Sequence, residues 1–161
     1  MPRVIVGFSG PQAAKITGVN YKTLDYWART GLIKPSIRDA SGTGTRRIYS
    51  LIDLVALKTV SILRERGLSL QKLRRAVERL RELAPDGVTN SEVLARHYLV
   101  TDGNDVYVVE SPDVLLSLLQ GGQLVLALWL GKMASNIIEA AKRETPAIGN
   151  MDQLETIAKA G

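Results

Sequence analysis

The sequence predicts an α+β protein with a mainly helical N-terminal half and a smaller mixed half after it. Within residues 9–83, capping residues and glycines mark the ends of four short predicted helices and of one extended, loop-rich stretch. Alternating, β-branched runs appear only after residue 97. A Pro-Asp-Gly break at residues 85–87 separates the two patterns, and we therefore expect one domain over 1–85 and another over 86–161.

Two short helices joined by a tight turn open the chain. Ser9 and Gln12 have the spacing of a capping box, which predicts a first helix to about Ile16. Gly18 suits a turn with positive φ, and Asn20 is a favourable N-cap for a second helix that ends before Gly31. The pattern is typical of a helix-turn-helix.

A polar, glycine-rich stretch from Ser36 to Thr45 follows, and residues 46–49 resume an extended pattern, so we expect a hairpin-like wing over residues 36–49. Ser50 then caps a third helix, and Ser69 begins a fourth that ends before Pro85. The apolar stripe predicted for the fourth helix is Leu70, Leu73, Val77 and Leu80.

The C-terminal half predicts a hairpin, a third strand and flanking helices. Tyr98–Thr101 and Val106–Val109 flank an Asp-Gly-Asn-Asp turn. The other elements expected are a helix from Thr89 toward His97, a helix from Ser111 to about Leu119, a strand over 124–130, and helices over 133–143 and 152–160.

The sign of the net charge changes at the predicted domain boundary near residue 85. Residues 1–85 carry 16 Lys and Arg against six Asp and Glu, whereas residues 86–161 carry five against ten. A basic module beside an acidic one is typical of a nucleic-acid binder with a separate partner region, because only the surface that faces phosphates gains from concentrated positive charge.

Several function classes are disfavoured by composition. The chain has no cysteine and only one histidine, His97, so we expect neither a metal site nor a cofactor. We find no paired acid and base or nucleophile constellation, which argues against an enzyme. Gly42-Thr43-Gly44 lacks the spacing of a phosphate loop. No apolar stretch has signal-peptide or membrane-span length, and a cytoplasmic location fits.

The N-terminal half resembles the DNA-binding domain of the MerR family over about residues 7–83. The order and spacing of many positions carry this resemblance, including Phe8-Ser9, Ala13-Ala14, residues 16–19, Thr23-Leu24, Tyr26, residues 31–35, Arg46-Arg47, Tyr49-Ser50, Asp53-Leu54, Leu63-Arg64 and residues 67–70. The resemblance implies a winged helix-turn-helix that places its second helix in the major groove of double-stranded DNA.

It also implies a homodimer that binds a palindromic promoter or operator, as a repressor or an activator. Leu24 and Trp27 are the positions of the second helix that we expect to be buried. The residues expected to face DNA are Asn20, Tyr21, Lys22, Thr23 and Tyr26 from the second helix, and Lys34, Arg38, Arg46 and Arg47 from the wing and its approach.

The chain departs from the family in two ways. It lacks the cysteines of the metal- and redox-sensing members, and its fourth helix is too short for a long dimerisation helix. We expect the acidic C-terminal half to mediate dimerisation or to bind RNA polymerase or another protein, with its third strand and apolar helix faces as the contact surface. An antitoxin-like autoregulator and an effector-independent architectural DNA-binding protein remain alternatives.

Overall fold

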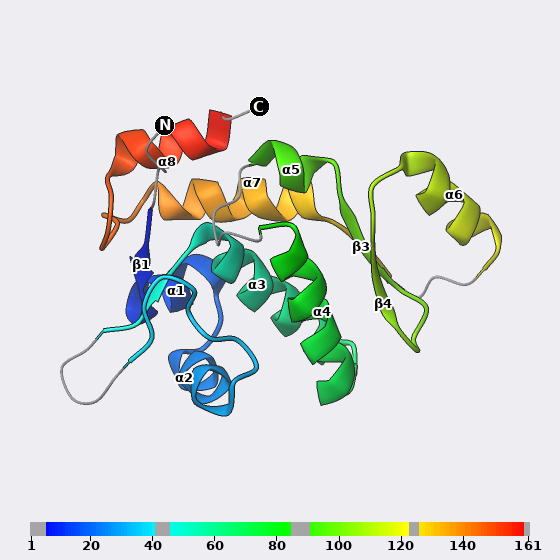
Figure 1. Cartoon of the computed structure of the whole chain (residues 1–161), viewed down its shortest axis with the longest axis horizontal. Coiled ribbons are helices and arrows are strands. Elements are labelled where there is room, and N and C mark those ends of the chain that lie inside the picture. Colours follow the sequence, from blue (N-terminus) through cyan, green and yellow to red (C-terminus); the bar gives the residue numbers. More distant parts are fainter. Residues whose placement is uncertain (1–5, 41–45, 85–90, 123–125, 160–161) are drawn as a thin grey trace.

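A computed structural model of the chain describes residues 6–40, 46–84, 91–122 and 126–159. The predicted α+β class is confirmed, because the described residues form a helix-rich body with two small antiparallel sheets (Figure 1). The helices are α1 (Gly10–Thr17), α2 (Tyr21–Thr30), α3 (Leu51–Glu65), α4 (Leu70–Glu82), α5 (Ser91–Ala95), α6 (Pro112–Gln120), α7 (Leu130–Ala141) and α8 (Met151–Lys159). The strands are β1 (Phe8–Ser9), β2 (Ile48–Tyr49), β3 (Tyr98–Thr101), β4 (Val106–Val109) and β5 (Leu126–Trp129).

Local capping explains where most helices begin. Ser9 and Ser50 each form a complete capping box, in which the serine hydroxyl accepts from the backbone N–H three residues on. Asn20, Ser69 and Ser111 cap α2, α4 and α6 through their side-chain oxygens. Each of these starts agrees with the sequence prediction. The capping residue predicted at Thr89 lies outside the described residues.

The smaller sheet joins the beginning of the chain to the end of the wing. Phe8 pairs with Tyr49, and Ser9 pairs with Ile48, in antiparallel register. Arg38 and Ile48 form a further antiparallel bridge through two backbone hydrogen bonds of 3.2 and 2.8 Å. The described part of the wing is therefore hairpin-like, as predicted, while residues 41–45 lie outside the described ranges.

The larger sheet has the strand order β4-β3-β5, with both neighbours antiparallel to β3. Its inner face buries Leu99, Thr101 and Val106 against the helical body. α4 is tied to the β3–β4 turn by an ion pair of 3.0 Å between Arg75 and Asp105. Of the strand predicted over 124–130, residues 126–129 form β5, Leu130 already begins α7, and residues 124 and 125 lie outside the described ranges.

Helix α7 packs against α1 and α3, so both halves of the chain share one hydrophobic core. Met133 contacts α3 directly, with its sulfur 3.0 Å from Oγ1 of Thr59. The other buried residues of this face are Leu130, Ala134, Ile137, Ile138 and Ala141. Most of the apolar face of α7 is therefore covered within the chain, and a dimer contact through the C-terminal half remains a prediction.

The fourth helix differs from its prediction at one position. Leu73, Val77 and Leu80 are buried as expected, but Leu70 is 55% exposed because it lies in the first turn, beyond the end of the core. The helix ends at Glu82, which agrees with a stop before Pro85. Within the described ranges, no helix combines the length and apolar character needed to cross a bilayer.

Candidate nucleic-acid interface

The turn between α1 and α2 is fixed by side-chain hydrogen bonds and by one glycine. The buried hydroxyl of Thr17 donates to the carbonyl oxygen of Ala13 and accepts from the N–H of Val19. Gly18 adopts φ 76°, where a side chain would be strained, and its N–H donates to the carbonyl of Ala14 at 2.9 Å. These contacts set the angle at which α2 leaves α1.

Helix α2 has one buried face and one exposed polar face. Leu24 and Trp27 are buried, as predicted, with 0% and 5% of their surface exposed. Tyr26 is 57% exposed, and Tyr21 and Lys22 are exposed as well. The helix therefore presents two phenol hydroxyls and an ammonium group to solvent, which are groups that bind phosphate oxygens and base edges.

An ion pair joins α2 to the base of the wing. Nη1 of Arg47 lies 2.5 Å from Oδ1 of Asp25, and Nε of Arg47 lies 3.3 Å from Oδ1 of Asp39. Asp25 also accepts from Nε of Arg29 at 2.8 Å. The hydrogen bonds from Arg47 and then Arg29 lower the pKa of Asp25, and the hydrogen bond to Asp25 raises the pKa of Arg47.

A hollow of about 630 Å³ lies between the start of α1, α2 and the wing. Tyr21 and Asp25 of α2 line it together with Arg46 and Arg47 of the wing. The ring of Tyr21 lies so close to Gly10 that a Cβ there would be 3.0 Å from Cε2 of the ring. A small residue at the start of α1 thus leaves room for this tyrosine.

Tyr49 lies behind this surface in the core. Its side chain is fully buried, and its hydroxyl has no hydrogen-bond partner among the described residues. Burial raises the pKa of Tyr49 because the phenolate would lose its hydration, so this tyrosine remains neutral.

The approach to the wing is anchored by a buried carboxylate. Oδ2 of Asp53 accepts from both the N–H and the hydroxyl of Ser36 at 2.8 Å, and its Oδ1 accepts from Arg81 of α4. The same guanidinium donates to the carbonyl oxygen of Lys34 at 2.8 Å. The backbone at residues 34–36 is therefore held from behind while the side chain of Lys34 is exposed.

A second hollow, of about 500 Å³, lies on the other side of α2. Arg64 and Arg74 line it together with Lys22 and Tyr26, so cations from α3 and α4 lie beside the exposed face of α2. Arg64 also lies over the ring of Trp27, 5.9 Å from its centroid. These two arginines are not predicted DNA contacts, because the local sequence pattern does not show that the ends of α3 and α4 approach α2.

The nine predicted contact residues fall into two groups. Six have exposed side chains that make no hydrogen bond or ion pair within the described part of the chain: Tyr21, Lys22, Tyr26, Lys34, Arg38 and Arg46. The other three are partly engaged. Asn20 caps α2, Thr23 is half-buried, and Arg47 binds Asp25 and Asp39. Their contacts with DNA remain predictions.

The histidine and the carboxylates form no metal-binding cluster in the described part of the chain. Among the described residues, no three His, Asp or Glu side chains lie close enough together to hold an ion. Nδ1 of His97 lies 2.5 Å from the carbonyl oxygen of Val93, one helical turn earlier. His97 thus has a local structural contact.

Comparison with known proteins agrees with this geometry. Residues 8–80 match the family model described as MerR HTH family regulatory protein. Over 128 residues, 80% of this chain, the sequence is 44% identical to proteins described as uncharacterized HTH-type transcriptional regulators of Mycobacterium bovis and Mycobacterium tuberculosis. The chain spans about half, 54%, of the length of these relatives. The segment 8–80 is therefore a helix-turn-helix segment of the MerR family.

Proposed function

We propose that this protein is a sequence-specific regulator of transcription that binds a palindromic promoter or operator as a homodimer. The observation that carries this proposal is the two-sided α2, which buries Leu24 and Trp27 and exposes Tyr21, Lys22 and Tyr26 beside a basic wing. In this arrangement α2 enters the major groove, and the wing contacts the backbone or the adjacent minor groove.

The exposed cations account for affinity, and α2 accounts for sequence preference. Lys34, Arg38 and Arg46 are exposed around the wing, where each phosphate contact would release counterions. Tyr21, Lys22 and Tyr26 lie on one helix face, where they reach base edges or the adjacent phosphates. Arg47 acts mainly by positioning, since Asp25 and Asp39 already neutralise much of its charge.

The direct test is selection of bound sequences from a random DNA library, followed by a footprint on the best site. We expect one inverted repeat with two half-sites, and Lys22→Ala should weaken binding to it at least tenfold. Lys142→Ala is the matched control, because Lys142 lies in the acidic C-terminal half and pairs only with Glu139 within the described residues. Failure to enrich any sequence, with no binding to duplex DNA in dilute buffer, would contradict the proposal.

A second candidate function is an autoregulator whose C-terminal half also holds a partner protein. The exposed apolar residues of α6 favour it, because a helix with such a surface is typical of a contact element. Co-purification of a stoichiometric second protein that leaves DNA binding intact would distinguish this function from that of a regulator acting alone.

A further inference from the structure

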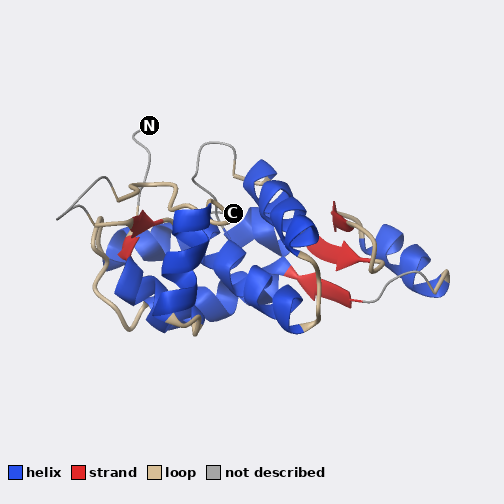
Figure 2. Cartoon of the chain, turned by 90° about the horizontal axis from the view of Figure 1, so that it is seen from below, coloured by secondary structure: helices blue, strands red, loops and turns tan. Residues whose placement is uncertain are grey.

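Helix α6 packs no side chain into the hydrophobic core of the described chain. None of its nine residues is buried, and Val114, Leu116 and Leu119 are 47%, 53% and 52% exposed. Figures 1 and 2 show the helix beyond the β3–β4 hairpin, at the far end of the molecule from the wing. Isolated helices shorter than about 12 residues are marginal in water, so α6 needs a surface to pack against.

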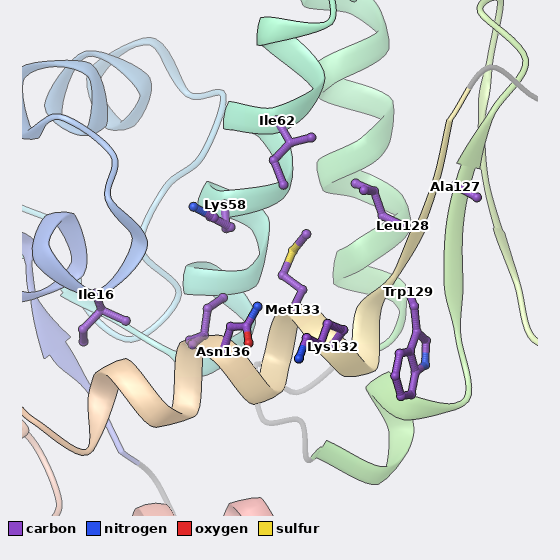
Figure 3. A pocket seen from close by; sticks show the side chains of 10 residues that line it. Ile16, Lys58, Ile62, Ala127, Leu128, Trp129, Lys132, Met133 and Asn136 are labelled. Carbon is purple, nitrogen blue, oxygen red and sulfur yellow. The ribbon is translucent and has the colours of Figure 1, made fainter.

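The described part of the chain also forms an apolar groove that none of its helices fills. It lies between α1, α3, β5 and α7 and has a volume of about 490 Å³ (Figure 3). Ile16, Ile62, Leu128 and Met133 form much of its wall, and the two lysines that line it are Lys58 and Lys132. We call this site the α3–α7 groove.

We propose that α6 of one copy docks in the α3–α7 groove of a second copy, so that two reciprocal contacts hold the homodimer together. This inference rests on the proposed function, because it supplies the dimer that a palindromic site requires. Both surfaces belong to each chain, and exchanging α6 in both directions satisfies a two-fold axis and closes the assembly.

Charge complementarity selects the second copy as the occupant. The charged side chain of α6 is Asp113, which makes no ion pair among the described residues, and Glu110 just before the helix lies 3.9 Å from Nε of Arg96. The charged side chains of the groove are Lys58 and Lys132. Lys58 donates only to the carbonyl oxygen of Thr17 at 3.3 Å, and Lys132 makes no ion pair among the described residues. Apolar leucines with acidic flanks therefore match an apolar wall with basic flanks.

The first experiment measures the dimer dissociation constant by sedimentation equilibrium. Leu116→Gln should raise it at least tenfold, whereas Leu70→Gln, a leucine of similar exposure on α4, should leave it unchanged. Lys132→Glu should also raise it, and adding Asp113→Lys should restore the affinity. A dissociation constant that does not respond to Leu116→Gln, or a charge reversal without rescue, would overturn the docking mode.

The second experiment uses the absence of cysteine from the chain. A tagged Leu116→Cys protein is mixed with an untagged Asn136→Cys protein under mild oxidation, and each variant carries a single thiol. We expect a mixed disulfide between the two copies. Predominant linkage of Leu116→Cys to itself, or no mixed product, would contradict docking in the groove.

Binding to an isolated half-site separates this inference from the proposed function. If Leu116→Gln is monomeric yet still binds a half-site, both statements stand. If the two cysteine variants form the mixed disulfide but the wild-type protein binds no duplex, the docking mode stands and the proposed function fails. A wild-type protein that remains monomeric until another protein covers α6 would overturn the choice of a second copy.

Discussion

Asp25 on α2 and Arg47 at the base of the wing form an ion pair, and Nε of Arg47 donates to Asp39 of the wing. The guanidinium side chain is only 15% exposed, so it lies within the protein surface and does not extend from it. The pair therefore sets the position of the wing relative to α2, which separates Arg47 in role from its exposed neighbour Arg46.

This difference predicts distinct effects of two adjacent substitutions on DNA binding. Arg46→Ala removes one exposed cation from each copy, so we expect the magnitude of the slope of log affinity against log salt to fall by about 0.9 per copy in the bound dimer. Arg47→Ala should weaken binding with a smaller change in slope, because its charge is already neutralised locally. Titration of a selected duplex at several salt concentrations measures both. Equal changes in slope would show that Arg47 contacts phosphate directly.

The same ion pair predicts how stability depends on pH. Arg47 and Arg29 lower the pKa of Asp25 in the folded protein below the ordinary value of 3.8, so the folded state favours the ionised carboxylate. Its contribution is complete above the ordinary pKa and is lost as the pH falls through the lowered one. Thermal unfolding should therefore show the difference between wild type and Asp25→Asn shrinking below about pH 4. A difference that grows on acidification would reverse the sign and contradict the assignment.

Substitution of two neighbouring aromatic residues of α2 should separate the affinity for DNA from the stability of the fold. Tyr26→Ala should weaken DNA binding roughly tenfold, because a hydrogen bond to a charged acceptor is lost, while the free energy of unfolding changes by about 0.5 kcal/mol or less. Trp27→Ala should cost about 3–5 kcal/mol, because it leaves a cavity in the core. Urea denaturation and a binding isotherm on each variant check the separation. A large loss of stability in Tyr26→Ala would place its ring in the core.

The buried carboxylate of Asp53 predicts that two arginines of α4 differ in their contribution to stability. Arg81→Ala removes the guanidinium that binds both Asp53 and the carbonyl oxygen of Lys34, and it should cost about 1–3 kcal/mol. Arg79 pairs with exposed Glu82 at 3.4 Å, so Arg79→Ala is the control and should cost less than about 1 kcal/mol. Urea denaturation of the two variants measures this ordering, and equal costs would show that the Asp53 contact contributes little.

Local signals predicted much of the fold and of the α2 surface from the sequence. The caps at Ser9, Asn20 and Ser50 act within three residues, and helical periodicity separates Tyr26 from Trp27. Both signals are readable without knowledge of tertiary structure. The start of α7 was predicted three residues too late, because Leu130 continues an apolar run that resembles a strand.

Relationships between distant positions could not be predicted in this way. Asp25 and Arg47 are 22 residues apart, and no periodic pattern links a helix to the far end of a loop. The placement of Arg74 beside Lys22 depends on how α4 crosses the body. The apolar stripe of α7 was recognised, but a stripe alone does not show whether it is buried by another copy or by the same chain.

The continuous core predicts that the two halves of the chain unfold together. Trp27 lies in the N-terminal half and Trp129 in β5, so the variants Trp129→Phe and Trp27→Phe each leave one fluorescent reporter. Because Met133 and Ile137 of α7 are buried in the core shared with α3, we expect the two urea transitions to have the same midpoint and the same m-value. Met133→Ala should shift both transitions downward by an equal amount, at a cost of about 2–5 kcal/mol. Separate midpoints, or a shift in the Trp129 reporter alone, would show that residues 1–85 and 86–161 are independent folding units despite their contact.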